Sequence, residues 1–86
     1  MKLNIKRKEK NLMIGEEMCT IKEFTCDEFD AFMDEKLSTA EKTKTMILLA
    51  LNQVDETLTM EDLSKIPMSV STDVLKIVNE LNGFED

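Results

Sequence analysis

Three carboxylates at helical spacing are the nearest approach to a chemical site in this sequence. Asp27, Asp30 and Asp34 recur at intervals of three and four residues, which places them on one face of a helix. Such a stripe could bind a cation or a basic surface of a partner protein. It could also be a solvated face, because acidic side chains near a helix N-terminus interact favourably with the helix dipole. No Gly occupies the sharp-turn position of a calcium loop, so the sequence excludes that motif.

The two thiols offer no metal or redox chemistry. Cys19 and Cys26 are the only cysteines, and the chain has no His. Two thiols cannot complete a zinc site, which takes four ligands. Their spacing also differs from the CxxC redox motif. We therefore expect two packed or half-exposed free thiols.

The sequence lacks the residues from which most catalytic sites are built. Without His, neither a Ser/His/Asp nor a Cys/His set can be assembled. Gly15 and Gly83 are the only glycines, so no phosphate-binding loop is present, and the absence of Tyr and Trp argues against base stacking. We expect a protein that is not an enzyme and that needs no cofactor.

Composition favours a single soluble domain spanning residues 1–86. Apolar residues make up 42% of the chain and charged residues 34%, which suits a globular protein. The net charge is −7; residues 1–10 carry five basic side chains and one acidic side chain, so the remainder is at −11. Nucleic-acid binding usually requires a basic face. The charge therefore favours a protein partner over a nucleic acid.

No segment is suited to a membrane or to secretion. The longest purely apolar run, residues 46–51, has six residues, far fewer than a membrane span needs. No apolar stretch follows the basic N-terminus as it would in a signal peptide. We expect the chain to remain in the cytoplasm of a bacterial host cell.

That apolar run predicts the central helix of the fold. It lies within residues 39–54, which are mostly good helix formers. At about 100° per residue, four side chains share one face: Ile47, Ala50, Leu51 and Val54. Met46, Leu48 and Leu49 fall on the other sides. A helix that is apolar all round is normally buried.

Residues 1–24 alternate in a way that is typical of short strands. Polar and apolar residues alternate over residues 2–6 and 20–24, and residues 12–14 form a further short strand that ends at Gly15. Residues 7–11 are expected to form a polar bend. We expect a two- or three-stranded antiparallel element, which must pack on helices to be stable.

Residues 25–84 are expected to form about four helices. Capping boxes predict helices from Thr25 to about Leu37 and from Ser38. A short third helix should begin at Thr59 and end before Pro67. The last helix should begin at Ser69 or Ser71 and end at Gly83, and its apolar stripe holds five residues: Val70, Val74, Ile77, Val78 and Leu81. The predicted fold class is α+β and mostly helical.

The seven methionines suggest where a partner would bind, because Met is over-used on surfaces that bind helices. Met33 and Met60 are expected to fill gaps in the core, whereas Met46 and Met68 are the better candidates for exposure. Met46 and Leu49 lie roughly opposite the core face of the central helix. If they are exposed, they would suit an amphipathic helix or a second copy of the chain. The other candidate surface is the stripe of Asp27, Asp30 and Asp34.

The order of these segments resembles the tail assembly chaperones of long-tailed phages, the group typified by the Mu-like family. The similarity covers residues 18–84. It rests on five segments: TIKEFT at 20–25, the acidic helix start at 27–30, the apolar helix at 46–51, LTMEDLSKIP at 58–67 and VNELNGF at 78–84. The first segment does not carry the family's Arg and Pro. The resemblance implies a non-enzymatic chaperone that binds the tape-measure protein and assists assembly of the tail tube.

Two other classes stay open. Residues 47–81 are similar to a winged helix-turn-helix, with a tight turn at Pro67 and a "recognition" helix from Ser71. That helix carries Asp73 and only one basic residue, Lys76, and residues 59–86 total −4, whereas phosphate contacts need basic residues. A small acidic phage protein could alternatively inhibit a basic host enzyme in an anti-defence role.

Overall fold

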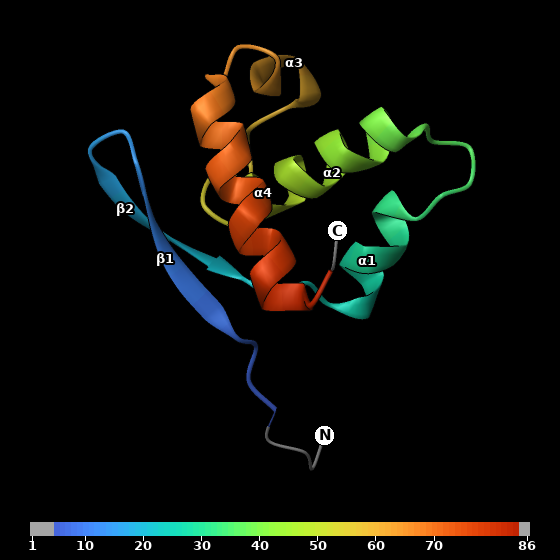
Figure 1. Ribbon diagram of the computed structural model, residues 1–86, viewed down its shortest axis with the longest axis horizontal. Helices are drawn as coiled ribbons and strands as arrows, with labels where there is room; N and C mark the ends of the chain where they lie inside the picture. The colour runs from blue at the N-terminus through green and yellow to red at the C-terminus, as the bar shows by residue number, and fades with distance from the viewer. Residues whose placement is uncertain (1–4, 85–86) are drawn as a thin grey trace.

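The computed structural model describes residues 5–84. A two-stranded antiparallel hairpin precedes four helices, and the longest helix, α4 (Met68–Asn82), crosses both the hairpin and α2 (Thr39–Asn52) (Figure 1). This arrangement confirms an α+β, mostly helical fold with an N-terminal antiparallel element.

A two-residue turn sets the register of the hairpin. β1 (Glu9–Ile14) pairs with β2 (Glu17–Lys22), and Gly15 in the turn has φ 64°. Positive φ at the first turn residue alone is typical of a type II′ turn, whose twist matches that of the flanking strands. The predicted bend at residues 7–11 is wrong, because this register extends β1 back to Glu9. The strand predicted at residues 2–6 lies mostly outside the described residues, and Ile5 and Lys6 form no strand.

One face of the hairpin is covered and the other is open. Cys19 and Ile21 of β2 are buried, and Leu12 of β1 packs against the same core. Met13 and Met18 are opposite each other in the register and are 54% and 61% exposed. The hairpin therefore uses the two-residue period of a half-buried sheet.

α1 (Cys26–Phe32) begins where the sequence predicts and ends earlier. Thr25 and Glu28 form the predicted capping box. The helix stops at Phe32 instead of Leu37 because the chain turns at Asp34. The Asp34 carboxylate accepts from the Lys36 N–H at 2.9 Å, and the Asp34 carbonyl accepts from the Leu37 N–H at 3.0 Å. Asp readily forms such local turns, which compete with a helix.

α2 is the central helix, as predicted, and its Ser38–Glu41 capping box is formed. Ile47, Ala50 and Leu51 are buried in the core. Val54 is an exception: it shares their face by helical spacing, but α2 ends at Asn52 and Val54 is 44% exposed.

α3 (Met60–Leu63) and α4 are separated by a short turn at Pro67. Thr59 caps α3 as predicted. α4 begins at Met68, so the predicted caps at Ser69 and Ser71 are wrong: Pro67 holds the N-cap position at φ −56° and ψ 143°, and no side chain caps the helix. The fixed φ of Pro suits a helix start, so α4 can begin without a hydroxyl cap.

The C-terminal end of α4 is tied to the rest of the fold. Gly83 has φ 70°, and the Phe84 N–H donates to the Asn79 carbonyl at 3.1 Å, which closes the helix as predicted. Phe84 then packs on Phe29 and Phe32 of α1, with ring centroids 5.9 Å apart in each pair. The Phe24 N–H donates to Asn82 Oδ1 at 2.8 Å, which ties the segment after β2 to the end of α4.

Candidate functional site

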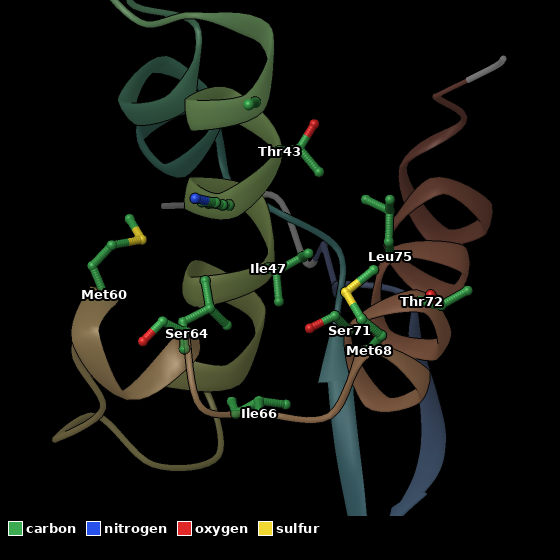
Figure 2. A pocket seen from close by; sticks show the side chains of 12 residues that line it. Thr43, Ile47, Met60, Ser64, Ile66, Met68, Ser71, Thr72 and Leu75 are labelled. Carbon is green, nitrogen blue, oxygen red and sulfur yellow. The ribbon is translucent and has the colours of Figure 1, made fainter.

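An open groove lies between α2, α3 and α4. Its volume is about 570 Å³, comparable with the pockets that bind ligands and peptide side chains. In Figure 2, Ile47 projects from α2 toward α4, and Met60 and Met68 stand on either side of it. Twelve residues line the groove: Ala40, Thr43, Lys44, Ile47, Met60, Leu63, Ser64, Ile66, Met68, Ser71, Thr72 and Leu75.

The lining is apolar and hydroxyl-bearing, with Lys44 as its single charged residue and no carboxylate. It therefore contains no acid–base pair and no set of metal ligands. Hydroxyl groups and flexible thioethers accommodate varied apolar side chains without leaving buried charges unpaired. The groove thus presents an apolar surface with several hydroxyl groups and a single amine.

Two helix starts position the exposed methionines. Met60 is the first residue of α3, directly after the Thr59 cap, and Met68 is the first residue of α4, directly after Pro67. Met60 is 43% exposed and Met68 is 78% exposed, whereas Leu63 between them is buried. The short turn between α3 and α4 thus holds both thioethers at the mouth of the groove while the intervening Leu anchors α3.

Only one of the predicted apolar contact residues lies in the groove. Met68 is exposed there, as expected. Met46 and Leu49 were expected to be either covered or partly exposed; both are half-buried, and Met46 packs against the core. Met33 and Met60 were expected in the core, yet Met33 is exposed at the end of α1 and Met60 lines the groove.

The acidic stripe is not formed as predicted. Asp27, Asp30 and Asp34 are all exposed, but α1 ends at Phe32, so Asp34 lies beyond the helix. Its carboxylate is engaged in the local turn with Lys36. In residues 5–84, no group of acidic, Cys or His side chains is arranged to hold a metal ion. The stripe is thus a set of separate solvated carboxylates.

The groove could not be predicted from the sequence because two of its apolar lining residues lie outside the predicted surfaces. Ile66 precedes Pro67, and Leu75 falls outside the apolar stripe of α4. Both are half-buried. The available signal was that Leu75 is apolar although it lies outside the predicted apolar stripe of α4.

Two carboxyl groups have perturbed pKa values, and both serve local turns outside the groove. Hydrogen bonds from the Ser38 backbone N–H and hydroxyl lower the pKa of Glu41. Hydrogen bonds from the hydroxyl and N–H of Thr57 lower the pKa of Asp55. These shifts come from helix capping and a turn, so they indicate structural roles.

No protein-family model, curated protein or solved structure matches this chain. Within residues 5–84, no helix is long and apolar enough to cross a membrane.

Proposed function

We propose that this protein is a non-enzymatic binding protein that accepts an apolar helix of a partner in the groove between α2, α3 and α4. Exposed, contiguous apolar surface usually marks an interaction site. The observation that carries the proposal is the pair of exposed methionines, Met60 and Met68, at the mouth of a groove lined with apolar and hydroxyl side chains. Helix-in-groove binding uses such a surface, read by side chains one helical turn apart.

The partner that we propose is the tape-measure protein of a phage or prophage tail, so that the protein acts as a tail assembly chaperone in the cytoplasm of the host. The resemblance over residues 18–84 supports this identity, because that family binds a long helical partner before tail-tube subunits surround it. A groove without carboxylates suits the apolar face of such a helix. The net charge of −7 would add attraction for a partner with a basic polar face.

The groove is tested by adding one charge at its mouth. Met60→Asp and Met68→Asp should each weaken binding of a tape-measure fragment about tenfold or more, because each puts a carboxylate against an apolar ligand. Both positions are the first residues of helices, where an acidic side chain interacts favourably with the helix dipole, so folding should be retained. Isothermal titration calorimetry measures affinity, and circular dichroism checks the fold.

Met18→Asp is the matched control, because it makes the same change at an exposed methionine on the hairpin, outside the groove. It should bind the fragment with wild-type affinity. Equal weakening by all three variants would show that charge alone matters. Folded groove variants that bind normally would place the partner on another surface.

A second outcome separates the proposed role from inhibition of a host enzyme. A chaperone should keep the tape-measure protein soluble when the two are co-expressed, and Met68→Asp should lose that effect. Capture of a host nuclease or polymerase, with no effect on tape-measure solubility, would favour the anti-defence alternative.

A further inference from the structure

The outer edge of β1 is an open strand edge. In the part of the chain that the structure describes, β1 pairs only with β2, in a sheet of two strands. Glu9, Lys10, Asn11 and Met13 are all exposed. Unpaired edges are ready templates for a further strand, so an open edge calls for a specific partner or a protective device.

The pairing pattern of the hairpin decides which backbone groups face outward. The Glu23 N–H donates to the Lys8 carbonyl at 2.9 Å, so these two residues are a hydrogen-bonded pair. Such pairs alternate with non-hydrogen-bonded pairs along an antiparallel ladder. The N–H and C=O groups of Glu9, Asn11 and Met13 therefore point away from β2. Within residues 5–84, no side chain or backbone group binds them.

The outer edge of β2 is covered at its end. The Lys22 N–H donates to Gln53 Oε1 at 2.7 Å, and Gln53 Nε2 donates to the Lys22 carbonyl at 3.1 Å. α2 also packs against β2. The β1 edge is thus the more open of the two.

The charges that flank β1 are complementary to one another. Lys6 and Lys8 precede the strand, Glu16 lies in the turn that follows it, and Glu17 is the first residue of β2; all four are exposed. Two β1 strands that pair antiparallel about Asn11 would bring the basic segment before β1 of each copy, with Lys6, toward the turn of the other copy, with Glu16. Opposite charges that face each other across an interface favour this pairing over others. In the same register Lys10 lies opposite Leu12 of the other copy, which avoids a pair of like charges.

We infer that a second copy of this chain binds at β1, with the two β1 strands antiparallel and centred on Asn11. The outward N–H and C=O groups of Glu9, Asn11 and Met13 then bond to those of the other copy. The product is one continuous sheet made of the two hairpins. Because both copies use the same β1 edge, two chains satisfy this contact, and the assembly is a closed two-fold dimer.

A proline on the β1 edge tests the inference directly. Among residues 5–84 the Asn11 N–H has no hydrogen-bond acceptor, so Asn11→Pro removes an outward donor while the ladder with β2 keeps its bonds. Asn11→Ala is the matched control. It loses the same hydrogen bond, in which Thr20 Oγ1 donates to Asn11 Oδ1 at 2.8 Å, but keeps the N–H.

Analytical ultracentrifugation at up to about 100 μM protein reports a dimer of even micromolar affinity. The wild type and Asn11→Ala should sediment at twice the chain mass of 9.9 kDa, and Asn11→Pro at the chain mass. Circular dichroism checks that the hairpin is folded. A monomeric wild type at that concentration overturns the inference, as does a dimer that Asn11→Pro leaves intact.

An exchange of charges tests the same interface without altering the backbone. It remains a valid test of the dimer if Asn11→Pro unfolds. Lys6→Glu and Glu16→Lys should each shift the protein toward monomer, and the double variant should restore the dimer. Failure of the double variant to restore it overturns antiparallel pairing at β1. A dimer that dissociates with Met68→Asp but not with these variants assigns self-association to the groove, whereas retained fragment binding by Asn11→Pro shows that the two surfaces are independent.

Discussion

At the scale of single residues, helical spacing predicted much of the core and failed where a helix ended. Leu51 and Val54 are three residues apart and share a face by spacing. Leu51 is 4% exposed, whereas Val54 lies past the end of α2 and is 44% exposed. Helical spacing assigns a side chain to a face only while the helix continues. An apolar side chain beyond Asn52 is therefore not placed in the core by its spacing.

We predict that Leu51→Ala lowers the free energy of unfolding by about 2–5 kcal/mol, because it truncates a buried side chain and leaves a cavity. In a domain of this size each kcal/mol shifts the thermal midpoint by roughly 4–8 °C. Val54→Ala is the control and should change stability by less than about 1 kcal/mol. Thermal unfolding followed by circular dichroism measures both, and a Leu51→Ala midpoint equal to wild type would remove Leu51 from the core.

The methionines show why a partner surface is harder to predict than a core. Met46 and Met68 have the same hydropathy and the same flexible side chain, yet Met46 packs against the core and Met68 is 78% exposed. What separates them is the packing of α2 on its neighbours and the turn at Pro67. The spacing of apolar residues predicts neither of these features. The groove is therefore apparent only when the three helices are positioned together.

At the scale of elements, capping boxes were the most dependable signals. The boxes at Thr25, Ser38 and Thr59 all form, each with the side chain of the third helical residue bound back to the cap. The failures have specific causes. Pro67 displaced the expected serine caps of α4, and the Asp34 turn shortened α1. A helix cap is formed by hydrogen bonds between residues close in sequence, so it can be predicted locally. The length of a helix depends also on whether a turn competes with it.

We predict that Ser38→Ala destabilises the protein by about 1 kcal/mol, because the Glu41 N–H loses its hydroxyl acceptor at the start of α2. Ser69→Ala is the control, since Ser69 lies inside α4 and no side chain caps that helix. It should change stability by less than about 0.5 kcal/mol. Urea unfolding compares the two; equal effects would show that the cap at Ser38 contributes nothing particular.

The same cap makes a pH prediction. Hydrogen bonds from Ser38, first from its backbone N–H, hold the pKa of Glu41 below its ordinary value. A carboxyl whose pKa is lowered by folding adds stability above its unfolded pKa, and that stability is lost as the pH falls through the folded pKa. Glu41→Gln should therefore flatten this part of the acid unfolding curve, while Glu35→Gln should not. A carboxyl NMR titration in which Glu41 has an ordinary pKa would contradict the prediction.

At the scale of the whole molecule, two basic residues of the N-terminal segment pair with acidic residues of the helices. Arg7 Nη2 lies 2.8 Å from Glu28 Oε1, and Lys10 Nζ lies 3.1 Å from Glu80 Oε1. Exposed ion pairs of this kind contribute little stability, but they tie the hairpin to α1 and α4. They also neutralise part of the only basic region in the sequence. α3, Pro67 and α4 do follow one another like the two helices of a helix-turn-helix, so charge is what separates that class from a protein-binding one.

We predict no binding to duplex DNA at micromolar protein in about 0.15 M salt, because a net charge of −7 repels phosphates and α4 presents few cations. Electrophoretic mobility shift with random and operator-like duplexes measures this. Lowering the salt to about 0.05 M strengthens every electrostatic contact, so weak non-specific binding would appear there first.

Lys76→Glu separates the two ways the prediction could fail. A sequence-specific shift that Lys76→Glu abolishes would assign α4 to the major groove and replace the chaperone proposal with a transcription regulator. A non-specific shift that survives Lys76→Glu and disappears with Lys8→Glu would place the contact on the N-terminal segment, leaving the groove between α2, α3 and α4 free for a protein partner.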